Sequence, residues 1–127
     1  MGVIKEVSSL RRYVAVDGGM ADNIRPALYG ARYEAVVAGK MEGKEMVTVD
    51  IAGKFCESGD ILIQDIMLPE MVTGDILAIP VCGAYCIPMA SNYNACLKPA
   101  IVAVRDGKVR LIRRRETLND LIDTDLV

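Results

Sequence analysis

The 127-residue sequence contains no histidine, the side chain whose unperturbed pKa lies nearest to physiological pH. A nucleophilic cysteine is normally activated by a histidine or another cation, so a histidine-activated thiol is excluded. The sequence also lacks CxxC pairs, although it contains four cysteines. Without such pairs or a companion histidine, the ligand spacings of a typical zinc site are missing. The cysteines are Cys56, Cys82, Cys86 and Cys96.

An excess of either charge is lacking too, because 15 Lys and Arg stand against 17 Asp and Glu and leave a net charge of -2. No global field therefore favours nucleic acid or an anionic membrane. The one basic concentration, RLIRRR at 110–115, is typical of the solvent side of a strand. Neither GxGxxG nor GxxxxGK[ST], the common phosphate-binding patterns, occurs.

Long hydrophobic runs are scarce. No positively charged segment followed by an apolar one opens the sequence, so no secretory signal is expected. The longest apolar stretch, residues 76–90, is interrupted by Pro80, Gly83 and Pro88. It is shorter than the ~20 residues that a membrane-spanning helix requires. The sequence thus predicts a cytoplasmic protein whose cysteines are reduced thiols.

What the sequence does contain is apolar material for one core, with 52% hydrophobic and 25% charged residues. A single domain over residues 1–127 is expected, since a domain holds roughly 100 to 200 residues. Short runs rich in Val, Ile and Tyr, separated by Gly, Asp, Asn or Pro, are typical of strands. We expect a mainly β Greek-key barrel or sandwich of about seven strands with one or two short helices. The predicted strands are 12–17, 33–38, 45–51, 61–66, 75–81, 100–105 and 108–113.

The last two predicted strands are joined by Asp106 and Gly107, a pair typical of a tight hairpin turn with positive φ. A helix is expected to follow them in RETLNDLIDTDL, residues 115–126. Thr117 can cap this helix, and Asp120 occupies the position that completes a capping box.

An earlier helix is predicted in ADNIRPALYG, residues 21–30. Asp22 or Asn23 is expected to cap it, Pro26 to lie in its first turn and Gly30 to end it in a left-handed conformation.

Three side chains are candidates for binding an anionic group. Arg25 and Tyr29 stand four residues apart, which places guanidinium and phenol on one helical face. The same spacing also fits an Arg on a solvated face beside a Tyr packed on the core. Tyr85 follows a Gly-Ala pair in CGAYCIPMASNYN and can offer its hydroxyl to a phosphate or carboxylate. It fits a core tyrosine equally well.

Cys56 is the candidate catalytic residue, in the loop GKFCESGD at residues 53–60. Its neighbours favour a tight loop with the thiol at the edge. A free thiol has a pKa of about 8.5, and the carboxylate of Glu57 disfavours the thiolate, so the thiol is expected to act as a proton donor. The alternative is a small buried apolar cysteine, because free cysteines are often buried.

Four motifs in order along the chain carry a resemblance to a known family. They are VDGGMADNIRPALYGARYEA, CESGDIL, GDILAIPVCGAYCIPMASNYN and RRRET. Together they resemble the C-terminal β domain of the diaminopimelate decarboxylases, which use pyridoxal phosphate and have an alanine-racemase-like fold. The resemblance covers the chain from about Val14 to Leu121, and CESGD with RPALY favours the diaminopimelate branch.

This resemblance implies a role for each candidate. Cys56 would protonate the carbon from which carbon dioxide has left, and Glu57 would bind the amino group at the far end of meso-diaminopimelate. Arg25 and Tyr29 would bind the far carboxylate, whereas Tyr85 would contact both cofactor and substrate. The family also implies a homodimer, in which Cys56 and Glu57 enter the partner's active site, and a role in lysine biosynthesis.

The family's (β/α)8 barrel, with the lysine that binds the cofactor covalently, lies outside this sequence. The chain's own lysines do not lie in a barrel-strand motif, so we expect the chain alone to be inactive. VIKEV, residues 3–7, is interpreted as the chain returning from the barrel of a two-domain protein. A missing N-terminal strand would leave an open sheet edge, which favours self-association. The alternatives are an ornithine- or arginine-type decarboxylase domain, or a non-catalytic β dimerisation module.

Overall fold

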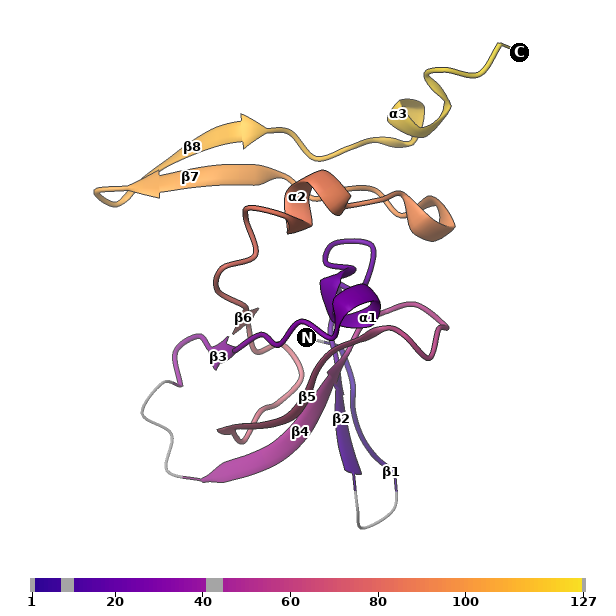
Figure 1. Ribbon diagram of the computed structural model, residues 1–127. Helices are drawn as coiled ribbons and strands as arrows, with labels where there is room; N and C mark the ends of the chain where they lie inside the picture. Colours follow the sequence, from indigo (N-terminus) through magenta and orange to yellow (C-terminus); the bar gives the residue numbers. More distant parts are fainter. Residues whose placement is uncertain (1, 8–10, 41–44, 127) are drawn as a thin grey trace.

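The computed structural model describes residues 2–7, 11–40 and 45–126, with Val7 described by its backbone alone. Its described part is mainly β-sheet with a few short helices, and Figure 1 shows their arrangement. The strands are β1 (Ile4–Val7), β2 (Arg11–Ala15), β3 (Val36–Val37), β4 (Met46–Ala52), β5 (Ile61–Pro69), β6 (Leu77–Ala78), β7 (Ile101–Arg105) and β8 (Lys108–Arg113). The helices are α1 (Arg25–Tyr29), α2 (Cys86–Met89), the 3-10 helix η1 (Tyr93–Ala95) and α3 (Leu118–Ile122).

The strands form three sheets. One has the order β1-β2-β4-β5, and β3-β6 and β7-β8 form two-stranded sheets. All pairs are antiparallel except β2 with β4, which is parallel. Each of the seven predicted strands overlaps an observed one, whereas β1 was not predicted. Within the described residues the sheets do not close into a barrel, so the prediction is confirmed only at the level of a mainly β chain.

Two predicted strands are much shorter than expected. The ranges 33–38 and 75–81 contain only the two-residue strands β3 and β6. Pro80 has no backbone N–H to donate to a ladder, and Val81 has a φ of 60° that ends the extended conformation. Both segments nevertheless contribute to the core, because Val37 is fully buried and Leu77 and Ile79 pack against the core cluster.

The core lies between the four-stranded sheet and the short β3-β6 sheet. Its most deeply buried side chains are Val14, Val37, Val49 and Ile51. Leu62, Ile63 and Leu68 of β5 pack in the same cluster. Burying one such side chain contributes about 1.5–3 kcal/mol, so this cluster holds β2, β4 and β5 in the positions from which the site loops extend.

Helix α1 begins at Arg25, one residue later than a cap at Asn23 predicts and two later than a cap at Asp22 predicts. Its N-cap is Ile24 and no side chain caps it, so Asp22 and Asn23 were wrongly predicted as caps. Both are engaged elsewhere, since Asp22 accepts a hydrogen bond from the Gly19 N–H at 3.1 Å and Asn23 contacts Cys86. The predicted ends are otherwise confirmed, with Pro26 in the first turn and a left-handed Gly30.

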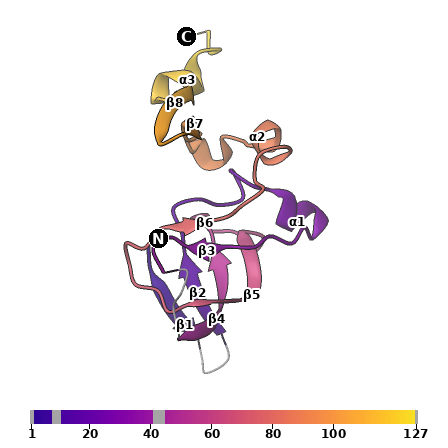
Figure 2. The same cartoon turned by 90° about the vertical axis from the view of Figure 1, so that its left-hand side faces the viewer.

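The C-terminal third stands apart from the four-stranded sheet, as Figure 2 shows. Here β7 and β8 form the predicted hairpin, and Asp106 and Gly107 have φ of 50° and 71°. The capping box of α3, from Thr117 and Asp120, is also confirmed. Helices α2 and η1 were not predicted. Among the described residues, no helix is both long and apolar enough to cross a membrane.

Candidate functional site

The loop between β4 and β5 carries Cys56, and the buried carboxylate of Asp60 organises it. Asp60 accepts hydrogen bonds from the backbone N–H groups of Met20 at 2.6 Å and Phe55 at 2.7 Å. Its own backbone carbonyl accepts from the Gly53 N–H at 2.8 Å. A Cβ added at Gly53 would overlap the Asp60 carboxylate, so the close approach requires glycine there. Burial raises the pKa of Asp60.

The thiol of Cys56 is exposed at the edge of this loop, as predicted. The alternative of a buried apolar cysteine is therefore wrong. Glu57 is also exposed, and one of its carboxylate oxygens accepts a hydrogen bond from the hydroxyl of Tyr93. This contact raises the pKa of Tyr93. The influence of Glu57 on the protonation of Cys56 stays a prediction.

Arg25 lies between two tyrosine rings. Its guanidinium carbon is 5.5 Å from the ring centroid of Tyr29 and 5.0 Å from that of Tyr85. Both tyrosines are exposed, at 66% and 65%, so neither is a core tyrosine. Stacking on aromatic faces holds a guanidinium while leaving its N–H groups free to bind an anion. A hollow of about 510 Å³ is lined by Arg25 and Tyr85, together with Tyr33 and Pro80.

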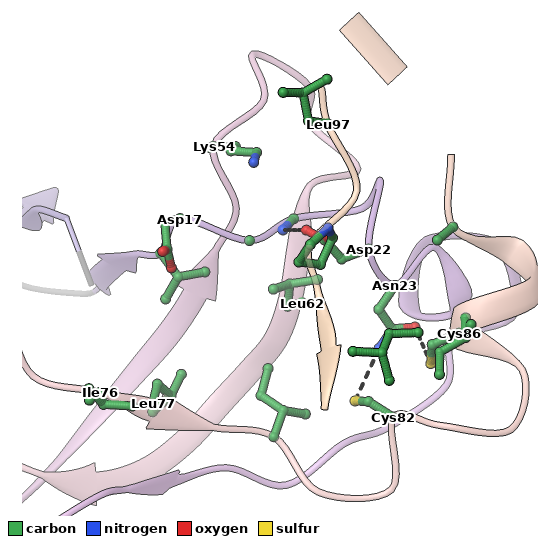
Figure 3. Close-up of a pocket in the computed structure, with 18 of the residues that line it drawn as sticks. Asp17, Asp22, Asn23, Lys54, Leu62, Ile76, Leu77, Cys82, Cys86 and Leu97 are labelled. Atoms are coloured by element: carbon green, nitrogen blue, oxygen red, sulfur yellow. Dashed lines mark hydrogen bonds between the residues drawn. The ribbon is translucent and has the colours of Figure 1, made fainter. Parts of the chain in front are cut away.

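Behind this arrangement, Asn23 connects α1 to α2. Its Oδ1 accepts hydrogen bonds from the Arg25 backbone N–H at 3.3 Å and from the Cys86 thiol at 3.2 Å. Its Nδ2 lies 3.9 Å from the sulfur of Cys82. Figure 3 shows Asn23 between the two sulfurs at one end of a cavity of about 570 Å³. Cys86 directly follows Tyr85, so the two hydrogen bonds of Asn23 link the backbone at Arg25 to the segment that carries Tyr85.

The two cysteines beside Asn23 are buried or partly buried thiols. Burial raises the pKa of Cys82 to about 11. The sulfur of Cys86 also lies 3.4 Å from the hydroxyl of Tyr33, and this contact raises the pKa of Tyr33. Cys82 and Tyr33 therefore stay protonated near neutral pH. The thiol of Cys86 serves as a structural hydrogen-bonding partner of Asn23 and Tyr33.

The candidate residues form two neighbouring groups rather than one. Among the described residues, no hydrogen bond, ion pair or ring contact joins Cys56 or Glu57 to Arg25, Tyr29 or Tyr85. The loop and the helix are nevertheless adjacent, because a Cβ at Gly59 would lie 3.7 Å from that of Ala27. The loop that carries the thiol and the carboxylate therefore lies next to the helix that carries Arg25 and Tyr29.

Sequence reasoning missed Asp60, Asn23 and Tyr93 as parts of this site. Asp60 was interpreted only as a loop boundary and Asn23 as a helix cap. Tyr93, in the segment CGAYCIPMASNYN, was given no role. Their partners lie 40, 63 and 36 residues away in the chain, and only the tertiary structure reveals such contacts.

A family model described as "Pyridoxal-dependent decarboxylase, C-terminal sheet domain" matches residues 2–83. The chain belongs to this family. Residues 2–83 include α1 and the Cys56 loop, so most of the candidate site lies in the part that the family shares.

Named relatives of this decarboxylase domain extend the likeness to the whole chain. Diaminopimelate decarboxylase of Bacillus subtilis (strain 168) is 54% identical over 126 residues, which are 99% of this chain and 29% of the relative. That of Corynebacterium efficiens is 48% identical over 131 residues, covering 99% and 28%. The chain thus spans less than a third of these relatives.

Solved structures of diaminopimelate decarboxylases also resemble this domain. The enzyme of M. jannaschii in complex with L-lysine has a TM-score of 0.91 and 42% identity, covering 99% of this chain and 28% of the other. The enzyme of Helicobacter pylori complexed with L-lysine has a TM-score of 0.86 and 40% identity, covering 96% and 29%.

Proposed function

We propose that this chain is the C-terminal domain of a diaminopimelate decarboxylase. The complete enzyme would convert meso-2,6-diaminopimelate to L-lysine with pyridoxal phosphate, as a carboxy-lyase of lysine biosynthesis in the cytoplasm. The names of relatives at 44% to 54% identity support this proposal. Three of the similar structures hold L-lysine, the expected product.

The observation that carries the proposal is the half-buried guanidinium of Arg25, which lies over the exposed rings of Tyr29 and Tyr85. A planar guanidinium binds a carboxylate through two parallel hydrogen bonds, and the two rings limit its rotation. Arg25 and Tyr29 would bind the far carboxylate of the substrate. A site built around that charge penalises an amino acid without it.

The residues present fit one edge of pyridoxal phosphate. The exposed Tyr85 ring carries a phenol that can contact both cofactor and substrate, backed by Arg25. No lysine lines the described hollow beside them, so covalent attachment of the cofactor is assigned to the barrel domain. When bound, the cofactor supplies an electron sink for the C–C bond that breaks.

Cys56 and Glu57 would have two further roles, proton donation after carbon dioxide has left and binding of the substrate. The S–H of Cys56 donates its proton to the carbon that has lost carbon dioxide, and the resulting thiolate takes a proton back from solvent. Glu57 would bind the far ammonium group of the substrate. Their exposure on a loop supported by Asp60 suits residues that enter a partner's site.

The whole protein is accordingly proposed to contain two domains, with residues 1–127 following a (β/α)8 barrel, and to form a homodimer with shared active sites. The predicted Greek-key arrangement applies to the β domain of this complete protein. We infer that its β domain is a Greek-key barrel or sandwich to which the three sheets described here contribute.

The test uses this chain joined to its barrel. Replacing Arg25 by Gln should raise the KM for meso-diaminopimelate about 10- to 100-fold, since a hydrogen bond to a charged group contributes roughly 1.5–3 kcal/mol. The matched control is Arg32→Gln, because Arg32 is exposed and lines the same hollow but is not among the described cation–ring pairs. We expect the control to change KM less than about 3-fold.

The same assay separates the alternatives. Faster turnover of ornithine or arginine than of meso-diaminopimelate would favour a related decarboxylase. No turnover of any of the three, with a correctly folded two-domain protein, would favour a non-catalytic module. Equal effects of the two arginine variants would remove Arg25 from the proposed carboxylate site.

A further inference from the structure

Tyr93 contacts the residues on both sides of Cys56. Its hydroxyl donates a hydrogen bond to Oε1 of Glu57. Its ring packs edge-to-face on Phe55, with the centroids 5.4 Å apart and the planes at 87°. Phe55 and Glu57 are the immediate neighbours of Cys56, so one side chain braces the tip of the loop from outside.

Tyr93 is itself held in place by charged groups. It opens η1, where Asn94 and Ala95 have positive φ of 52° and 56°. The preceding Asn92 donates from Nδ2 to Glu116 at 2.6 Å and to the carbonyl of Cys96 at 3.0 Å. These bonds close the turn around Tyr93 and attach it to the segment that precedes α3.

Lys98 completes this support. Its ammonium donates to Oδ1 of Asn92 at 2.7 Å and lies 3.3 Å from a carboxylate oxygen of Glu116. The backbone N–H of Lys98 also donates to Glu116 at 2.8 Å. The side chains of Lys98 and Glu116 are only 23% and 24% exposed, so the backbone of Tyr93 is anchored to a partly buried ion pair.

The hydrogen bond leaves Glu57 with a fixed orientation. Oε1 is occupied by the phenol, whereas the exposed carboxylate keeps Oε2 for another donor. A free glutamate loses side-chain entropy when it binds a ligand, and a carboxylate already held in one position loses less. An ammonium group donates hydrogen bonds and suits the remaining oxygen.

From these contacts we propose that Tyr93 is a positioning residue that aims the Glu57 carboxylate at the far ammonium group of the substrate, and thereby sets selectivity for a diamino over a monoamino diacid. This inference rests on the proposed function of Glu57. Tyr93 and Glu57 belong to the same chain, so their hydrogen bond is kept whether the loop enters the active site of its own subunit or that of the partner.

The experiment compares Tyr93→Phe with wild type in the holoenzyme, this chain joined to its barrel. The variant keeps the ring contact with Phe55 and removes only the hydroxyl. We expect the KM for meso-diaminopimelate to rise about 10-fold, the order of one hydrogen bond to a charged group, with kcat changed less than about 3-fold. The inhibition constant of 2-aminopimelate, which lacks the far amino group, should change less than about 2-fold.

Two further variants make the result decisive. Tyr13→Phe, on β2, is the matched control and should leave both constants unchanged. Adding Tyr93→Phe to Glu57→Gln should raise KM less than about 2-fold beyond Glu57→Gln alone, because residues that act as one unit are not additive. Independent multiplication of the two effects, or equal weakening of 2-aminopimelate, would overturn the positioning role.

Failure of this inference is distinguishable from failure of the proposed function. An unchanged KM in Glu57→Gln overturns the assigned role of Glu57 and the Tyr93 proposal with it. A raised KM in Glu57→Gln with an unchanged KM in Tyr93→Phe overturns the Tyr93 role alone. In this chain, NMR with ring-labelled tyrosine should show a lower pKa of Tyr93 in Glu57→Gln than in the wild type, since Glu57 is the main cause of the raised pKa. An unchanged Tyr93 pKa would show that the hydrogen bond between Tyr93 and Glu57 does not form in solution.

Discussion

At the scale of single residues, the position of the candidate thiol depends on one buried carboxylate. Asp60 is 2% exposed and joins the loop after β2, through Met20, to the loop after β4, through Phe55. Glycines at 19 and 53 let these backbones approach it. The loop that carries the exposed Cys56 is thus held in place by the buried carboxylate of Asp60.

Gly53→Ala tests this close approach. The added methyl group overlaps the Asp60 carboxylate, so the loop must shift, and overpacking of this kind costs about 1–3 kcal/mol. We expect a lower free energy of unfolding by that amount in chemical denaturation of this chain. Gly83→Ala is the control, because nothing lies within 4 Å of its added Cβ. Equal stability of the two variants would contradict the tight packing around Asp60.

The exposure of Cys56 could be predicted because polar and glycine neighbours define a loop locally. The role of Asp60 could not, because it depends on Met20, 40 residues earlier in the chain. The predicted cap at Asn23 failed partly for the same reason, because its Oδ1 is shared with the thiol of Cys86, 63 residues later. Asp22 failed for a local reason, because it accepts from the Gly19 N–H three residues earlier.

At the scale of elements, α3 is stabilised by charge at its start. Asp120 accepts hydrogen bonds from the Thr117 N–H at 2.7 Å and hydroxyl at 2.8 Å. Both terminal nitrogens of Arg114 bind the same carboxylate, at 2.7 and 2.6 Å. Arg114 and Thr117 hold the pKa of Asp120 well below its usual range.

This depressed pKa predicts how α3 responds to acid. The folded-state pKa of Asp120 lies below the unfolded value of about 3.9, so its stabilisation is present above that value. It is lost only as the pH falls through the lower, folded-state pKa. In an NMR titration, the Thr117 amide shift should therefore change at lower pH than for an ordinary Asp, and in Asp120→Asn this change should vanish.

Asp123→Asn is the control for this titration, since Asp123 ends α3 but lies outside the capping box. It should leave the Thr117 amide titration as in the wild type. A Thr117 midpoint near the ordinary value for Asp would show that the capping box does not hold in solution.

Elements that depend on residues close in the sequence could be predicted, and elements that depend on distant residues could not. The α3 capping box and the hairpin turn at Asp106 and Gly107 rest on neighbouring residues, and both are confirmed. The turn of η1 depends on Glu116, 24 residues after Asn92, and on Lys98, which pairs with Glu116. Neither composition nor periodicity in SNYN indicates such an anchor.

At the scale of the whole molecule, the β7-β8 hairpin lies apart from the four-stranded sheet (Figure 1), and the two strands pair only with each other among the described residues. Val102 lies opposite Leu111, and Val104 opposite Val109. Directly opposed residues of an antiparallel pair share a face. These four side chains are all at least 50% exposed, so the hairpin presents an apolar face.

The sequence indicated that RLIRRR forms a strand with a solvated basic side. It did not indicate that the apolar side lies uncovered, because period-two alternation identifies a buried face without identifying what buries it. Open sheet edges and contiguous apolar patches are the features that promote association between copies. The apolar face of the hairpin is therefore a second surface for self-association, besides the open sheet edge expected from the sequence.

We expect the 127-residue chain to associate reversibly as its concentration rises, and Val104→Lys with Leu111→Lys to suppress this. Two lysines on one face of the hairpin bring like charges from facing copies together and remove apolar area that would otherwise be buried. Sedimentation velocity over a concentration series measures the change. Leu126→Lys is the matched control, because Leu126 is an exposed apolar residue outside the hairpin and its substitution adds the same kind of charge. If the double variant associates as strongly as the control, the contact lies elsewhere, and the open edges of the other sheets become the surface to test.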